Sequence, residues 1–197
     1  MQNKVIIITL LFFNCSLPVF SQQGGVKDFK LINAVNKNEV SLSDFNNKKV
    51  IAVIFTSNYC PYSKLYEQRI LDLHKRFAGQ GFQILLINPN NPEKSKDDSI
   101  EKMAQKARDK TFPFPYLADK NQLVCKQFGA TKTPEAFLLA KKGNSFQVVY
   151  HGAIDDNPQV PQDVTNAYIS DAIVAALGGK AVRNAKTRAT GCVIKMN

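Results

Sequence analysis

The sequence predicts an α/β fold in which a central mixed β-sheet is flanked by helices. Two apolar runs rich in β-branched residues, 50–55 and 82–87, have the pattern of strands buried on both faces. Between them, apolar residues recur at the spacing of one helix face: Tyr62, Tyr66, Ile70, Leu73 and Phe77. A strand, a helix and a second strand of this kind form a βαβ unit with a right-handed crossover.

Further elements precede and interrupt this arrangement. Residues 28–32 and 38–42 predict an N-terminal β-hairpin that turns at Asn36-Lys37-Asn38. The polar stretch 88–98 predicts an inserted loop, which leads into a weak helix at about 99–110. Asp98 and Glu101 have the spacing of a capping pair for that helix.

The second half predicts a hairpin followed by a helix. A short strand at 112–117 and a helix at 120–128, ended by Gly129, come first. Strands at 135–140 and 146–150 then form the hairpin. The final helix uses four apolar positions and is closed by Gly178-Gly179; they are Val164, Ile169, Ile173 and Leu177. A βαβ half followed by a hairpin and a helix is the order of a thioredoxin-like fold.

The chain begins with a predicted signal peptide at residues 1–21. Lys4 precedes an apolar stretch from Val5 to Phe13, and Val19-Phe20-Ser21 has small residues at the two positions that a signal peptidase reads. The sequence therefore predicts export to the periplasm, a single redoxin domain at 22–178 and a tail at 179–197. A lipoprotein anchored through Cys15 and a retained N-terminal anchor are the alternatives.

The composition argues against several classes of function. The formal net charge is +10, but lysines are interleaved with acidic residues and no basic stripe carries spaced aromatics, which argues against nucleic-acid binding. His74 and His151 are the only histidines, and no C-x-x-C motif is present. The sequence therefore predicts neither a metal site nor a cofactor.

Cys60 lies where the apolar run 50–55 has ended and a helix begins. A helix N-terminus offers unpaired N–H groups and a partial positive charge, which stabilise a thiolate and lower its pKa. Pro61 suits the first helical turn, and Ser63 occupies the position of the second cysteine of a C-x-x-C pair. We interpret Cys60 as a reactive thiol; the alternative is a buried structural cysteine.

After removal of the signal peptide three cysteines remain, so at least one is free, transiently paired or paired between chains. Cys125 stands among apolar neighbours on a predicted helix, which favours core packing. Cys192 lies on the tail. It is either a resolving cysteine on a segment that folds back or an exposed, incidental thiol.

Four stretches carry a resemblance to a known family: Ser57-Asn58-Tyr59-Cys60-Pro61-Tyr62-Ser63-Lys64, Thr131-Lys132-Thr133-Pro134-Glu135, Tyr150-His151-Gly152-Ala153-Ile154-Asp155-Asp156-Asn157, and Gly191-Cys192-Val193-Ile194-Lys195. The chain resembles an exported, peroxiredoxin-like redoxin of the alkyl hydroperoxide reductase and thiol-specific antioxidant superfamily. The resemblance covers nearly all of the mature chain. It implies that Cys60 is the nucleophile and that a cis Thr133-Pro134 bond faces it, turning the backbone of Lys132 or Thr133 toward a substrate.

The sequence departs from the family pattern at several positions near the expected site. Val53 and Ser57 replace the proline and threonine that usually precede the cysteine, and the Ser57 hydroxyl remains able to bind a peroxide oxygen. Lys132 replaces a cysteine found in related chains and brings an ammonium near the thiolate, which would lower the pKa of Cys60 further. Ser63 either hydrogen-bonds the thiolate or is an ordinary first-turn residue. The expected substrate-binding residues are Ser57, Pro61, Ser63, Lys132, Thr133 and Pro134.

Other polar residues near these motifs are expected to be structural. Arg69 and His74 lie too far along the helix to reach Cys60, and Arg69 is expected to be a surface or ion-pair residue. Asp155 and Asp156 either cap their loop or lie near the site.

The predicted function is thiol-dependent oxidation and reduction. The Cys60 thiolate attacks a peroxide, giving a sulfenic acid, or a substrate disulfide, giving a mixed disulfide. Cys192, Cys125 or an external thiol reductant then completes the cycle, because Ser63 cannot. The alternative is a non-catalytic thioredoxin-fold module that captures peptides or thiols. The sequence leaves open the substrate, the reductant and the oligomeric state.

Overall fold

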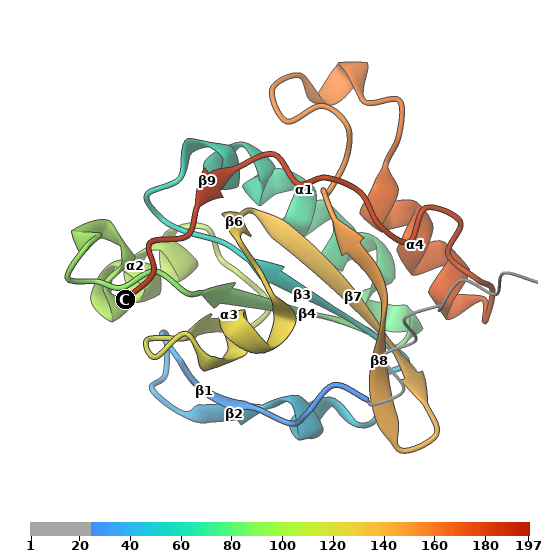
Figure 1. Cartoon of the computed structure of the whole chain (residues 1–197), viewed down its shortest axis with the longest axis horizontal. Helices are drawn as coiled ribbons and strands as arrows, with labels where there is room; N and C mark the ends of the chain where they lie inside the picture. The colour runs from blue at the N-terminus through green and yellow to red at the C-terminus, as the bar shows by residue number, and fades with distance from the viewer. Residues whose placement is uncertain (1–24) are drawn as a thin grey trace, which may run out of the picture.

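The computed structural model describes residues 25–197, so the predicted signal peptide at 1–21 lies outside the described residues. The strands of the main sheet are β1 (Lys30–Asn33), β2 (Glu39–Ser41), β3 (Val50–Phe55), β4 (Phe82–Asn88), β5 (Tyr116–Ala118), β7 (Glu135–Lys142) and β8 (Ser145–Gly152). Their order is β2-β1-β5-β4-β3-β7-β8 (Figure 1). Strand β3 is parallel to β4 and antiparallel to β7, which confirms the mixed sheet and the thioredoxin-like order.

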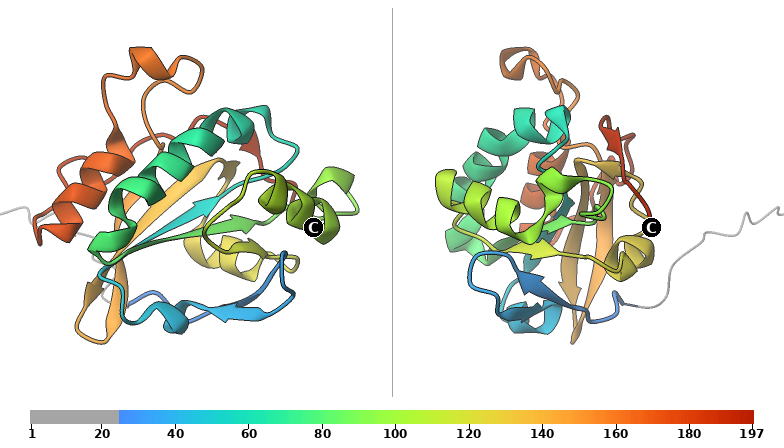
Figure 2. Two further views of the ribbon diagram at one scale, coloured as in Figure 1. Left: turned by 180° about the vertical axis from the view of Figure 1, so that it is seen from behind. Right: turned by 90° about the vertical axis from the view of Figure 1, so that its left-hand side faces the viewer.

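Every residue of β3 is buried, as its continuous apolar run predicts. Successive side chains of a strand point to opposite faces. One face of the sheet packs on α1 (Pro61–Phe77), α2 (Ile100–Asp109) and α4 (Tyr168–Leu177), and the other on α3 (Leu123–Phe128). In the right-hand view of Figure 2, α1 and α2 lie on one side of the sheet and α3 on the other.

The N-terminal hairpin and the inserted helix are confirmed, with a correction at the helix cap. β1 and β2 pair in antiparallel register, and β1 also joins β5. The cap of α2 is Ser99, whose hydroxyl accepts the N–H of Lys102. Asp98 does not cap this helix because its carboxylate is buried elsewhere, beside the cysteine loop.

Three predicted boundaries shift in the second half. The strand expected at 112–117 is β5, which begins only at Tyr116. The helix expected from residue 120 begins at Leu123, because the Asp119 carboxylate accepts the N–H groups of Val124 and Cys125. Val164 precedes α4, where it follows a short 3₁₀ helix at Pro161–Asp163.

The tail is extended, as expected, but it packs along the domain. Its first part follows β8, where Thr187 donates its N–H to the carbonyl of His151. Its last part contains β9 (Cys192–Val193), which pairs with β6 (Lys132–Thr133) in a separate two-stranded sheet. Figure 1 shows β9 beside β6 near the N-terminal end of α1.

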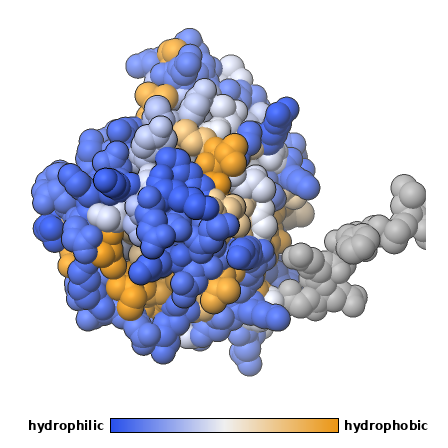
Figure 3. Space-filling model, turned by 60° about the vertical axis from the view of Figure 1, so that its left-hand side comes forward, coloured by the Kyte–Doolittle hydropathy of each residue, from blue (hydrophilic) through white to orange (hydrophobic). Residues whose placement is uncertain are grey.

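The described chain buries its apolar residues in two cores, one on each face of the sheet. The face shown in Figure 3 is largely hydrophilic, with a few small apolar patches. Among residues 25–197, no helix has the length and apolar character needed to cross a membrane.

Candidate active site

Cys60 is the N-cap residue of α1, which begins at Pro61. The residue is fully buried, yet its position at the start of a 17-residue helix favours negative charge on the sulfur. The strand–cysteine–proline–helix junction expected from the sequence is therefore present.

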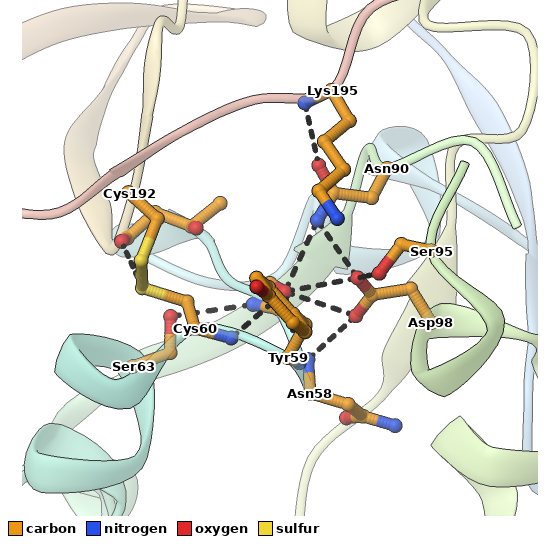
Figure 4. The surroundings of a disulfide bond; sticks show 11 residues. Asn58, Tyr59, Cys60, Ser63, Asn90, Ser95, Asp98, Cys192 and Lys195 are labelled. Atoms are coloured by element: carbon orange, nitrogen blue, oxygen red, sulfur yellow. Dashed lines mark hydrogen bonds between the residues drawn. A yellow bond between two sulfur atoms is a disulfide. The ribbon is translucent and has the colours of Figure 1, made fainter.

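Cys60 is joined by a disulfide to Cys192, and 132 residues of sequence separate the two (Figure 4). Their Cα atoms lie 5.9 Å apart. Of the two alternatives for Cys192, the structure shows the tail that folds back. Cys192 therefore supplies the second sulfur that is missing from the helix, where Ser63 occupies the second position of a C-x-x-C pair.

The Thr133-Pro134 peptide is cis, as the resemblance implies. The carbonyl oxygen of Thr133 lies 2.9 Å from Sγ of Cys60, and Thr133 is also the cross-strand partner of Cys192. Its buried side-chain Oγ1 has no hydrogen-bond partner among residues 25–197. The loop before the proline thus faces both cysteines.

Glu135 holds that loop in place. Its carboxylate accepts the N–H groups of Thr131 at 2.7 Å and Lys132 at 3.0 Å, and lies 2.5 Å from Nε2 of His151. The His151 ring stacks on Phe137 with centroids 4.2 Å apart. Burial alone would raise the pKa of Glu135, but the hydrogen bonds from His151 and the two backbone groups outweigh it and lower the pKa.

Asp98 organises the loop that precedes Cys60. Its buried carboxylate accepts the Ser57 hydroxyl at 3.0 Å and the Asn58 N–H at 2.6 Å. Three further donors complete its surroundings: Ser95, Asn88 and Asn90. Burial alone would raise the pKa of Asp98, but these hydrogen bonds outweigh it and lower the pKa.

Ser57 connects Asp98 to the cysteine. Its Oγ accepts the N–H of Tyr59 at 3.1 Å and that of Cys60 at 3.3 Å. The Asp98 carboxylate therefore orients the Ser57 hydroxyl, which in turn orients the backbone of Cys60.

Residues 24–147 match the model of the AhpC/TSA family, which is more than half of the chain. This chain belongs to the AhpC/TSA family. None of the curated proteins compared with it matches.

Solved structures extend the likeness beyond the family match. A hypothetical protein from Sinorhizobium meliloti 1021 is 33% identical with a TM-score of 0.80, covering 88% of this chain and 93% of its own. An uncharacterized conserved protein from Geobacillus kaustophilus is 30% identical with a TM-score of 0.81, covering 88% and 91%. Peroxidoxin BcpB from Mycobacterium tuberculosis is 20% identical with a TM-score of 0.54, covering 79% and 92%, and shares the fold.

In this AhpC/TSA family member, the expected substrate-binding residues surround the cysteines but several have other partners. The Ser57 proton is donated to Asp98 in this disulfide form. Ser63 is buried and accepts the Ser57 N–H at 3.3 Å. Pro61 is exposed in the first turn of α1, and the partly exposed Lys132 lines a cleft with Glu135 and His151.

Several polar side chains outside the disulfide have structural partners. Arg69 forms an ion pair, with Nη1 2.6 Å from the Asp155 carboxylate. Asp156 accepts hydrogen bonds from the side chains of Thr165 and Asn166, so both aspartates tie down their loop. His74 packs edge-on against Phe114.

Cys125 is a core residue, as expected. It is fully buried and is the only free cysteine among the described residues. Burial raises the pKa of its thiol to about 12, with further contributions from the carboxylates of Asp119 and Glu135. Its thiol therefore stays protonated and shielded at neutral pH.

Sequence reasoning missed the residues that anchor the end of the tail. Ile194 is buried in the core on the α3 side of the sheet. Asn90 accepts the Lys195 N–H at 2.9 Å, and the side chain of Gln122 contacts both the Lys195 carbonyl and the Asn197 N–H. The signals were weak: polar residues in a loop, and one apolar residue in a basic tail.

Within residues 25–197, no group of three or more His, Cys, Asp or Glu side chains is placed to hold a metal ion.

Proposed function

We propose that this protein is an exported thiol-dependent oxidoreductase in which Cys60 is the nucleophile and Cys192 the resolving cysteine. One observation carries the proposal: the disulfide joins the N-cap of α1 to the tail, beside a cis proline. The family supports thiol redox chemistry in general, and the observed disulfide supports these two cysteines as the groups that carry it.

With a peroxide ROOH, the Cys60 thiolate attacks an oxygen atom and releases ROH after proton uptake, which leaves a sulfenic acid. The Cys192 thiol then attacks the Cys60 sulfur, and water leaves as the disulfide forms. With a substrate disulfide, the thiolate forms a mixed disulfide and releases one thiolate, and Cys192 then displaces the other. Each route ends in the observed Cys60–Cys192 pair, which an external thiol must reduce.

The decisive experiment is intact mass analysis of the reduced mature chain after one equivalent of hydrogen peroxide. We expect a loss of two hydrogens, mapped to a peptide that joins Cys60 and Cys192. Cys192→Ser should retain one added oxygen on Cys60, and Cys125→Ser should behave as wild type because that thiol is buried. If Cys60→Ser consumes the oxidant as wild type does, the proposal is wrong.

Turnover assays distinguish peroxide from disulfide as the substrate. With excess thiol, consumption of peroxide indicates a peroxidase, and reduction of an insulin-like disulfide indicates thiol–disulfide exchange. A chain that forms the disulfide once and turns over neither substrate would be a binding module.

Export is part of the proposal and rests on residues 1–21. Expression of the full chain in a bacterial host should give periplasmic protein whose first residue is Gln22. Intact cytoplasmic protein would contradict it.

A further inference from the structure

The two cysteines of the disulfide differ in exposure. Cys60 is fully buried, whereas Cys192 is partly exposed next to Val193, which is 74% exposed. A thiolate that reduces a disulfide must reach one sulfur and expel the other as a thiolate. The geometry therefore directs attack to Cys192 and makes Cys60, at the helix N-terminus, the leaving group.

A cationic cleft lies beside the β6–β9 strand pair that carries Cys192. It has a volume of about 470 Å³ and is lined by the cationic residues Lys132, Lys186 and Arg188 together with Glu135 and His151. Among residues 25–197, none of the three cationic side chains forms an ion pair. The carboxylate of Glu135 is already engaged by His151 and two backbone N–H groups. The cleft therefore carries net positive charge.

The backbone holds these cations in position. Lys186 is flanked by Ala185, whose carbonyl accepts the His151 N–H, and by Thr187, whose N–H bonds to the His151 carbonyl, both at 2.9 Å. The Thr187 hydroxyl also accepts the N–H of Ala153 at 2.9 Å. The first part of the tail is thus a fixed wall of the cleft.

The cleft also adjoins the strand pair that carries Cys192. Lys132 directly precedes Thr133, which pairs across the strands with Cys192. Ala189, another lining residue, stands three positions before Cys192 in the tail. A ligand held by the cations would therefore lie next to the β6–β9 strand pair that carries Cys192.

We propose that this cleft binds the carboxylates of a low-molecular-weight thiol, which reduces the protein by attacking Cys192. The inference rests on the proposed function and names the class of its reductant. The thiolate RS⁻ attacks Sγ of Cys192, forming RS–S–Cys192 and releasing the Cys60 thiolate. A second RS⁻ attacks the sulfur of R, releasing RSSR and the Cys192 thiolate. The volume fits a ligand of di- or tripeptide size, since small-molecule sites span about 300–1,000 Å³.

The test compares the rates at which the oxidised protein is reduced by glutathione, which carries two carboxylates, and by neutral 2-mercaptoethanol. The glutathione preference is the rate with glutathione divided by the rate with 2-mercaptoethanol. Comparing this preference between two proteins cancels the intrinsic reactivity of each thiol. We expect Lys186→Gln/Arg188→Gln to lower the glutathione preference about tenfold, within the range of electrostatic effects on association rates. High salt should lower it in wild type as well.

The matched control is Lys49→Gln/Lys142→Gln. It removes the same charge from exposed lysines at the opposite end of the sheet. Glu135 and Lys142 begin and end β7, so about 23 Å of strand separates them. The control should keep the wild-type ratio. An equal ratio in all three proteins, or equal losses in both variants, overturns the cleft assignment.

A separate experiment determines which of the two cysteines glutathione attacks. With one equivalent of glutathione, acid quenching and peptide mapping should place the mixed disulfide on Cys192; a mixed disulfide on Cys60 overturns the proposed direction. S-methylglutathione, which has the carboxylates but no thiol, should slow reduction by glutathione but not by 2-mercaptoethanol. Failure here leaves the peroxide-driven formation of the disulfide untouched, so it is distinguishable from failure of the proposed function.

Discussion

The buried carboxylate of Asp98 holds the loop before Cys60 in place. A buried carboxylate loses its hydration, and that cost is offset only when good hydrogen bonds replace it. Here several side chains and one backbone N–H donate hydrogen bonds to the two carboxylate oxygens. The Ser57 hydroxyl is one of these donors, and its oxygen also accepts the Cys60 N–H. The position of the nucleophile therefore depends on a residue 38 positions away in the sequence.

Replacing this carboxylate should destabilise the protein in a pH-dependent way. We expect Asp98→Asn to lower the free energy of unfolding by about 3 kcal/mol at pH 7, because the amide presents donors to donors. The pKa of Asp98 is lower in the folded state than its unfolded value of about 3.9. Its contribution is thus complete above about pH 4 and is lost as the pH falls through the folded pKa.

Urea denaturation of both proteins at pH 7 and pH 3 measures this difference, which should narrow at the lower pH. Asp97→Asn is the matched control, since Asp97 is exposed and its side chain makes no described hydrogen bond to the loop. A gap that is constant or wider at pH 3 would contradict the assignment.

Cys125 offers a second prediction for a single residue. In the reduced native protein at pH 8, iodoacetamide should alkylate the partly exposed Cys192 while leaving Cys125 unmodified, because its thiol is buried and its pKa is about 12. In 8 M urea all three should react. Mass mapping of the alkylated peptides checks this, and rapid native labelling of Cys125 would be inconsistent with the core position.

At the scale of elements, two strands of two residues each bring the cysteines together. The pairing of β9 with β6 requires a close backbone approach at Gly191, where an added Cβ would lie 2.3 Å from the Thr133 carbonyl oxygen. Gly152 plays the same part for the upstream tail, since its Cβ would lie 2.3 Å from the Thr187 carbonyl oxygen. Tail docking thus depends on the absence of two methyl groups.

Gly191→Ala tests this dependence. The methyl group must push β9 away from the Thr133 carbonyl, so we expect the equilibrium constant for forming the Cys60–Cys192 disulfide to fall at least tenfold, or about 30 mV. Equilibration in glutathione redox buffers, followed by acid quenching, measures it. Gly79→Ala is the control because a Cβ there meets nothing within 4 Å; equal effects of both changes would refute the steric argument.

For the whole molecule, the disulfide closes the chain over 132 residues and ties the tail to the first βαβ unit. A cross-link of this length removes much entropy from the unfolded chain. The tail has further anchors at Ile194, Asn90 and Gln122, so its end is held by packing and hydrogen bonds as well. Redox state and global stability are therefore coupled.

Cys192→Ser should lower the free energy of unfolding by about 2–5 kcal/mol relative to the oxidised wild type. The physical reason is the loss of the covalent loop closure. Guanidinium denaturation with and without a reductant measures it, and the reductant should bring wild type to the level of the variant. Equal stability of the oxidised wild type and the variant would contradict this coupling.

The central strands, helix α1 and the place of Cys60 at the start of that helix could be predicted from the sequence, because these follow from local patterns: apolar runs, helical spacing and a proline in a first turn. The sequence left Cys192 between two alternatives and misassigned Asp98 to a helix cap. It also missed the contacts of Glu135, Asn90 and Gln122. These features emerge only in the folded chain, because such contacts join residues far apart along the sequence, and their geometry depends on the path of the backbone between them.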